Sequence, residues 1–186
     1  MESYTTQLAT DHRFFMQQLI SFYRKKNGFM RTPTLVTTEG DQPCARTVVL
    51  RDIFEEQFIF FTDVRSKKVQ QLHHCPKACL HGYDPHKQLQ LVGYGVLEKI
   101  LHHPQLKSWQ HQASQRLEDY IGVKPPGSLL APGEKQAFER QYGEKNICIL
   151  GFSPYRWDVL QLNSPHHHRF HWVLENGQWI SENLAP

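Results

Sequence analysis

Two lysines and a serine follow an apolar segment of the chain and could bind an anion together. Ser66, Lys67 and Lys68 come after Phe60-Phe61-Thr62-Asp63, and Arg46 opens the preceding apolar run. Unpaired backbone N–H groups and the positive end of the dipole favour an anion at the start of a helix. A guanidinium also matches a phosphate monoester better than an ammonium does. The pattern predicts a phosphate site, and the alternative is a solvated basic turn.

Two strands and a helix must position these side chains. Residues 46–51 (RTVVLR) and 58–62 (FIFFT) are β-branched and aromatic, and the charged connection between them predicts a hairpin. A helix is predicted over 69–74. Further runs with strand character are 33–38, 76–82, 88–97, 146–152, 155–162, 169–174 and 178–181. Asn176-Gly177, between the last two runs, is typical of a two-residue hairpin turn.

Helical periodicity occurs in two other segments. Residues 11–26 carry apolar side chains at three- and four-residue spacing and end at Asn27-Gly28, which predicts a helix that packs on the sheet. Residues 104–120 predict a second helix. The length of 186 residues and the lack of a linker composition suit one domain over 1–186. Strands without regular βαβ alternation predict a mainly β or α+β fold.

Composition argues against several classes of partner. The balance of 21 Lys and Arg against 18 Asp and Glu gives only +3, too weak a charge to indicate a nucleic-acid or membrane surface. No run of eighteen apolar residues occurs, and the first residues lack the layout of a signal peptide. These features predict a cytoplasmic protein without nucleic-acid or membrane partners. The 4 cysteines form no C-x-x-C pair and are expected to be free thiols.

The residue types in the stretch 46–68, and their order, resemble those of a known family. RTVVLR (46–51), FFTD (60–63) and SKK (66–68) are similar to the R-x-V-L-L-K, F-Y-T-N and S-R-K elements of the pyridoxamine-phosphate oxidase family, the FMN-binding split barrels. Near the C-terminus HHRF (167–170), Trp179 and LAP (184–186) keep the layout of that family's last strands. The resemblance covers the chain from about residue 33 to residue 186.

This resemblance implies a fold, a cofactor and a site. The fold would be a six- to seven-stranded antiparallel split β-barrel with peripheral helices, and the cofactor FMN. The implied cofactor-binding residues are Arg46, Thr47, Val48, Val49, Leu50, Arg51, Phe61, Thr62, Ser66, Lys67, Lys68, Gln88 and Arg169. Arg51 and His167 would lie on the substrate side. The family also implies a homodimer with FMN at the subunit interface, where Gln88 and Arg169 reach the cofactor held by the other chain.

Several departures from the family pattern concern the substrate. Pro165 replaces an arginine that would bind a substrate phosphate, Arg51 replaces a lysine, and Leu160 replaces a flavin-side tryptophan. The tyrosine, arginine and serine set on the family's second helix has only Trp109 and Arg116 as loose counterparts. These losses favour a divergent member, such as the cyanobacterial-type FMN-binding branch, over a true pyridoxamine-phosphate oxidase. They assign no catalytic residue.

Two classes of function follow. The first is an FMN-dependent oxidoreductase that acts on a small-molecule substrate, an amine or a vitamin B6-like donor. The second is a flavin-binding or flavin-shuttling module without turnover, or a split barrel that uses haem or a deazaflavin instead. The histidines at 73, 74 and 166–168 match no zinc-site spacing, so no metal is expected. Hydrolysis is disfavoured because the chain has no G-x-S-x-G element.

Overall fold

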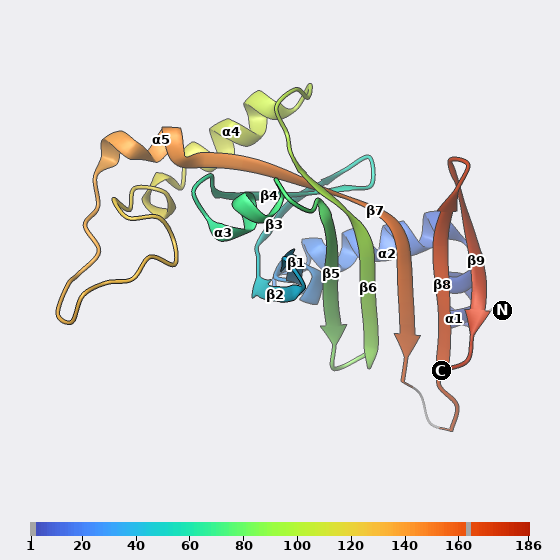
Figure 1. Ribbon diagram of the computed structural model, residues 1–186. Helices are drawn as coiled ribbons and strands as arrows, with labels where there is room; N and C mark the ends of the chain where they lie inside the picture. Colours follow the sequence, from blue (N-terminus) through green and yellow to red (C-terminus); the bar gives the residue numbers. More distant parts are fainter. Residues whose placement is uncertain (1–2, 163–164) are drawn as a thin grey trace.

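The computed structural model describes residues 3–162 and 165–186, which form an antiparallel sheet with helices around it (Figure 1). The strands are β1 (Thr34–Glu39), β2 (Gln42–Thr47), β3 (Leu50–Phe54), β4 (Gln57–Asp63), β5 (Lys77–Asp84), β6 (Leu89–Lys99), β7 (Ile147–Gln161), β8 (His168–Glu175) and β9 (Gln178–Leu184). The α-helices are α1 (Tyr4–Thr10), α2 (His12–Arg24), α3 (Lys67–Gln71), α4 (Leu106–Ser114) and α5 (Gly143–Asn146). Short 3-10 helices cover Phe29–Arg31, Leu117–Asp119 and Arg140–Tyr142.

The sheet has the order β2-β1-β5-β6-β7-β4-β3, and every neighbouring pair is antiparallel. The hairpin β8–β9 joins the path through β7. This confirms the predicted mainly β fold with peripheral helices. The described sheet has nine strands, more than the predicted six or seven, because the β8–β9 hairpin adds two strands to a path of seven.

The two ends of the strand order are joined by only two residues. β2 ends at Thr47 and β3 begins at Leu50, although these strands lie at opposite ends of the path. The sheet must therefore curl round until β2 and β3 lie next to each other, and we call the line between these two strands the seam. Within the described residues no hydrogen-bond ladder joins β2 to β3 across it. The prediction of one strand over 46–51 is wrong. The Val48 N–H donates to the Pro33 carbonyl at 3.0 Å, whereas Leu50 pairs with Phe60 on the other side of the seam.

The long strand β7 connects the two halves of the barrel. It pairs with β6 along one edge, and along its other edge it pairs first with β4 and then with β8 (Figure 1). The predicted strands 146–152 and 155–162 are thus one strand of 15 residues. Pro154, which falls between the two predicted strands, lies opposite Gly95 next to an irregularity in the ladder, where a missing N–H is tolerated.

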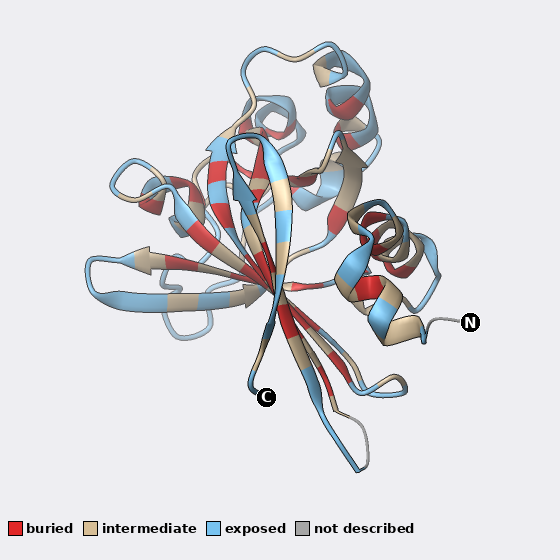
Figure 2. Ribbon diagram, turned by 90° about the vertical axis from the view of Figure 1, so that its right-hand side faces the viewer, coloured by how far each residue is buried: buried red, intermediate tan, exposed pale blue. Residues whose placement is uncertain are grey.

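Apolar side chains form two clusters on opposite sides of β4 and β7. The larger cluster fills the barrel and includes Phe58, Trp157 and, from α2, Phe15 and Leu19. The smaller cluster lies under α4, where Trp109 packs with Ile59 and Ile149. Because both of its faces are covered, β4 is buried along most of its length, whereas buried residues in β5 and β6 alternate with more exposed ones. Figure 2 shows strands in which buried and more exposed residues alternate.

The helices follow the predicted pattern in part. α2 lies within the predicted 11–26 range, and the Asp11 carboxylate caps it by accepting the Phe14 N–H at 3.0 Å. α4 ends at Ser114, so the predicted 104–120 helix is too long. The chain beyond it turns because the Asn146 side chain donates to the Tyr120 carbonyl at 2.7 Å. That bond brings the end of this segment back to the start of β7.

Candidate functional site

Two cations lie side by side at the seam of the barrel and bond only neutral oxygens. Lys68 Nζ donates to Thr62 Oγ1 at 2.9 Å and to Ser66 Oγ at 3.4 Å. Arg46 donates from Nη1 to Thr37 Oγ1 and from Nη2 to an amide oxygen of α3 at 3.1 Å. The end of β4 and the start of α3 position the lysine, and β2 positions the arginine. The predicted set of Arg46, Ser66 and Lys68 is thus brought together, and we call these residues, with Thr62, the anion corner.

The charges of Arg46 and Lys68 are not paired directly with carboxylates in the described structure, although Asp63 lies near Lys68. Among the residues of the described chain, neither cation lies within ion-pair distance of an acidic side chain. Burial lowers the pKa of Lys68 and the neighbouring Arg46 lowers it further, whereas the nearby Asp63 raises it. Burial also lowers the pKa of Arg46. Two half-buried like charges repel each other, and a bound anion would relieve this repulsion.

A pocket of about 260 Å³, which we call the seam pocket, opens beside Lys68, whereas Arg46 and Ser66 are not among its lining residues. The predicted cofactor residues that line it are Thr47, Val48, Val49, Arg51, Phe61, Thr62 and Lys68. The Arg51 guanidinium lies 5.8 Å from the centre of the Phe61 ring, and its buried Nε has no hydrogen-bond partner among the described residues. The pocket therefore offers an apolar wall and a cation next to the anion corner.

A loop that is remote in sequence covers this pocket. Arg65 pairs with Asp63 through contacts of 3.0 and 2.7 Å, and it also donates to the carbonyls of Gly122 at 2.8 Å and Val123 at 3.0 Å. This clamp places Tyr120, with Asp119 and Pro126, in the pocket wall. Sequence reasoning missed these residues, because no local motif indicates a contact across more than fifty positions.

The Tyr120 side chain is buried in the pocket wall. Burial raises the pKa of its hydroxyl, although the nearby Arg51 lowers it. The hydroxyl stays protonated near neutral pH. It is therefore a neutral donor or acceptor beside Arg51.

Two other predicted cofactor residues, Lys67 and Leu50, lie outside the anion corner. Lys67 is exposed and lines a neighbouring pocket with Glu39 and Gly40, on the other side of α3. Leu50 is 2 % exposed and packs in the barrel core. The helix that follows has only five residues and begins at Lys67, and Ser66 makes no side-chain cap bond. The helix dipole is thus a smaller attraction than the sequence suggested, and the side-chain cations dominate.

Gln88 and Arg169 lie at the far end of β7. Thr62 pairs with Cys148 of β7, and Arg169 pairs with Leu160, twelve positions further along the same strand. At about 3.3 Å per residue this is a path of roughly 40 Å. Gln88 is next to the same end, since the Leu162 N–H donates to its carbonyl at 2.9 Å. Within one chain these residues do not share a pocket with Lys68.

Arg169 is held in place at that end of the sheet. Its guanidinium donates to both carboxylate oxygens of the buried Asp158, at 3.1 and 2.9 Å. The hydrogen bonds to Asp158 raise the pKa of Arg169. Arg169 and His167 line a pocket of about 280 Å³ beneath α1. Gln88 is exposed in the β5–β6 turn at φ 51°, so its predicted place in a strand is wrong.

Three residues at departures from the family pattern, Trp109, Arg116 and Pro165, give no second anchor in the seam pocket. Trp109 is buried under α4 and its indole donates to Asp52 at 2.9 Å, so it faces the small core cluster. Arg116 and Pro165 are exposed. None of these three lines the pocket beside Lys68. The substrate anchors that the sequence lacked are not replaced from these positions.

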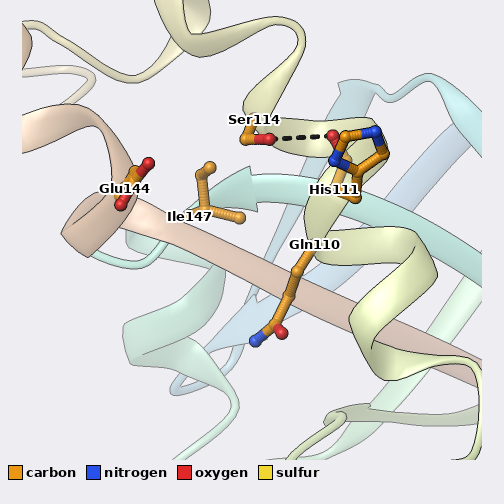
Figure 3. A pocket seen from close by; sticks show the side chains of 5 residues that line it. All are labelled: Gln110, His111, Ser114, Glu144 and Ile147. Carbon is orange, nitrogen blue, oxygen red and sulfur yellow. Dashed lines mark hydrogen bonds between the residues drawn. The ribbon is translucent and has the colours of Figure 1, made fainter.

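A further hollow of about 350 Å³ lies between α4, α5 and the start of β7 (Figure 3). Gln110, His111 and Ser114 of α4 face Glu144 and Ile147 across it, and the Ser114 hydroxyl donates to the His111 carbonyl at 2.8 Å. None of the predicted cofactor residues lines this hollow. Its polar groups do not converge on a common point (Figure 3).

The described ranges of the chain are 3–162 and 165–186. They hold no group of three His, Cys, Asp or Glu side chains placed to bind a metal ion. None of their helices has the length and apolar character needed to cross a membrane.

The match to a family model decides the identification. Residues 7–100 match the model described as pyridoxamine 5'-phosphate oxidase, FMN-binding domain. The chain belongs to this family. The matched range contains every predicted cofactor residue of the barrel seam, and also Gln88. Arg169 lies outside it.

Relatives of this pyridoxamine 5'-phosphate oxidase family cover most of the chain. A pyridoxine/pyridoxamine 5'-phosphate oxidase 2 of Hydrogenovibrio crunogenus is 28% identical over 196 residues, covering 95% of this chain and 90% of the relative. A pyridoxine/pyridoxamine 5'-phosphate oxidase of Azotobacter vinelandii is 27% identical over 177 residues, covering 82% and 77%.

Solved structures agree with the family's fold. A pyridoxamine 5'-phosphate oxidase-related, FMN binding protein of Nostoc punctiforme superposes with a TM-score of 0.73 at 24% identity, over 95% of this chain and 98% of that one. PhzG of Burkholderia lata, solved with tetrahydrophenazine-1-carboxylic acid, gives a TM-score of 0.75 at 13% identity, over 100% and 98%. At these identities the likeness supports the split-barrel fold alone.

Proposed function

We propose that this member of the family binds FMN in the seam pocket and acts as an FMN-dependent oxidoreductase on a small amine or vitamin B6-like donor. The observation that carries the proposal is the pair of neighbouring cations, Arg46 and Lys68, which form no ion pair among the described residues, with Lys68 lining a pocket that has apolar walls. A phosphate monoester binds best to cations that are not already paired. A cation in an ion pair with a carboxylate would have less of its charge available to the phosphate. The family membership supports the same cofactor.

The residues present fit FMN. Arg46 and Lys68, with the Thr62 and Ser66 hydroxyls, would hold the phosphate through charge-assisted hydrogen bonds. The apolar side chains of the pocket, among them Phe61, would pack against the ring system and exclude water. When bound, the flavin supplies the redox chemistry, and the protein supplies binding and orientation.

Arg51 and Tyr120 would act on the substrate side. Arg51 lines the seam pocket and forms no ion pair among the described residues, so the terminal N–H groups of its guanidinium would be available to an acceptor group of the donor molecule. The neutral Tyr120 hydroxyl lines the same pocket and could orient a second polar group. The roles of Arg51 and Tyr120 are thus positioning a donor and keeping bulk water out.

A second function is favoured by the missing substrate anchors. Pro165, where the family's oxidases carry an arginine, offers no cation to a substrate phosphate, and it is exposed. This observation favours a flavin-binding or flavin-shuttling module without turnover. A split barrel that holds haem or a deazaflavin is the other form of this alternative. The oxidoreductase and these alternatives share the fold. They differ in whether a donor molecule reduces the cofactor bound to the purified protein.

An anaerobic bleaching screen separates the two functions. The FMN-loaded protein is mixed with amines, vitamin B6 forms or reduced nicotinamides, and the flavin absorbance is followed. An oxidoreductase is expected to bleach with one donor class and to recover its colour in air. A stable yellow spectrum with every donor supports the non-catalytic module instead. If purified apo-protein does not bind FMN at all, the proposed cofactor is wrong.

We propose further that the complete site forms between two subunits. The separation of Lys68 from Arg169 along β7 supports this, since one FMN cannot contact both within one chain. The seam pocket of about 260 Å³ is also smaller than the roughly 300–1,000 Å³ that is usual for ligand pockets, so a second chain would enlarge it. A two-fold dimer would create two equivalent sites.

Sedimentation of the FMN-loaded protein is expected to give twice the 21.9 kDa chain mass. Mixing two variants tests whether the site is shared. Lys68→Ala and Arg169→Ala should each bind FMN weakly alone, because both sites of either dimer lack a contact. After subunit exchange, the mixed dimer has one site with both residues, so a fraction of tight sites should return. A monomer with stoichiometric FMN, or no recovery on mixing, contradicts the shared site.

A further inference from the structure

Arg46 is oriented by two neutral side chains from other elements. Its Nη1 donates to the hydroxyl of Thr37 on β1, and its Nη2 donates to Oε1 of Gln71 on α3 at 3.1 Å. Both partners are almost completely buried, with 1% exposure for Thr37 and 5% for Gln71. The remaining N–H groups of the guanidinium have no acceptor among the described residues. One side of Arg46 is therefore fixed and the other is free.

The orientation of the Gln71 amide is itself fixed. Its Nε2 donates to Glu39 Oε2 at 3.2 Å, which directs Oε1 toward Arg46. Thr37 donates its hydroxyl hydrogen to the same Oε1, so this oxygen accepts from both neighbours. Every polar atom of the Gln71 side chain is thus paired. The Glu39 carboxylate contacts the Nε2 of this amide and forms no ion pair with the Arg46 guanidinium.

We propose that Gln71 is a positioning residue for the cofactor phosphate: it fixes the Arg46 guanidinium with a neutral oxygen and leaves the positive charge of Arg46 available to the phosphate. This inference rests on the proposed FMN site. A glutamate at position 71 would have almost the same shape, but its charge would compete with the phosphate for Arg46. The role of Gln71 therefore depends on the neutrality of its amide as well as on its shape.

The test compares FMN with riboflavin, which has the same ring system and no phosphate. Gln71→Glu is combined with Glu39→Gln, so that the new carboxylate faces Arg46 without repulsion from Glu39. We expect FMN affinity to fall by about 10- to 100-fold and riboflavin affinity to stay within about twofold, because the loss corresponds to one charge-assisted contact. A loss of packing alone would weaken both ligands together.

A matched control lies next to Gln71. Gln70 is exposed on the same helix and donates to the Arg65 carbonyl at 3.3 Å, away from Arg46. Gln70→Glu adds the same charge to α3, so it should leave the FMN-to-riboflavin affinity ratio nearly unchanged. Thr37→Val, which keeps the shape and removes the other neutral partner, should lower the ratio in the same direction and serves if the double variant does not fold.

The outcomes distinguish this inference from the proposed function. If the parent protein binds FMN much more tightly than riboflavin and the position-71 and Thr37 variants keep that ratio, the positioning role is wrong and the FMN site stands. An equal fall with Gln70→Glu would show a long-range charge effect and also overturns the role. If the parent protein binds neither flavin, the proposed function fails first.

Discussion

Replacing Lys68 with alanine is expected to weaken FMN binding by about 10- to 100-fold, because a hydrogen bond to a charged group contributes about 1.5–3 kcal/mol. Lys68 is held by Thr62 and Ser66 and forms no ion pair with a carboxylate in the described part of the chain, so its charge would be available to a bound anion. Riboflavin should bind the variant nearly as well as the parent. Titration of both flavins into apo-protein, followed by fluorescence quenching, measures the two affinities.

Two controls accompany the Lys68 variant. Lys26→Ala removes one exposed lysine beyond α2 and reports the general effect of a lost charge. Gln88→Ala removes a neutral predicted contact and should weaken FMN less than Lys68→Ala does, since neutral hydrogen bonds are roughly half as strong as charge-assisted ones. FMN binding at the parent's affinity in Lys68→Ala would mean that the phosphate lies elsewhere.

The anion corner could be predicted because it is local in sequence. Thr62, Ser66 and Lys68 belong to one strand-to-helix connection, so their proximity follows from the hairpin and the turn. The choice between the two lysines could not be predicted. Successive helical residues point in directions about 100° apart, and only the observed start of α3 at Lys67 decides which lysine faces the pocket.

The partners that complete the corner depend on tertiary contacts. Thr37 and Gln71 are 34 positions apart, and no spacing rule links a strand threonine to a helix glutamine. Tyr120 reaches the pocket only through the clamp that Arg65 forms with the loop carbonyls. Such side chains carry ordinary signals of a buried strand, a helix or a loop, so their part in the site appears only when the fold is known.

The sequence pattern predicts that Gln88 lies in a strand, although the residues before it indicate the turn in which it is found. Asp84-Pro85 is turn chemistry, and the Asp84 side chain accepts the N–H groups of His86 and Lys87 at 2.9 and 3.1 Å. This Asx-type turn extends to Gln88, whose φ is 51°. The alternating pattern of the following strand hid the turn, because it continues naturally backwards to Gln88.

Replacing Trp157 with alanine is expected to lower the free energy of unfolding by about 3–5 kcal/mol, the usual cost of removing a buried tryptophan. Trp157 is fully buried on β7, and its ring packs against Phe15 of α2 and Phe58 of β4 at centroid distances of 5.9 and 5.4 Å. It also fills the space above Gly93, where an added Cβ would lie 2.7 Å from the indole. Urea unfolding followed by circular dichroism measures the loss.

Trp157→Phe separates packing from the polar atom of the indole. The indole N–H is buried and has no partner in the described structure, so phenylalanine removes an unpaired donor while it keeps an aromatic ring between α2 and β4. Its expected loss is below about 1.5 kcal/mol. Equal losses for the two variants would contradict this account, because they would mean that a phenylalanine ring restores none of the packing of the indole.

The position of Trp157 links stability to the site. β7 pairs with β4 up to Phe152 and with β8 from Arg156, so Trp157 stands where the strand changes partners. Its contact with Phe58 fixes β4, the strand that carries Phe61 and Thr62 into the pocket. Folded Trp157→Phe should therefore keep the parent's preference for FMN over riboflavin. A large loss of that preference without loss of stability would mean that the ring positions β4 without stabilising the barrel.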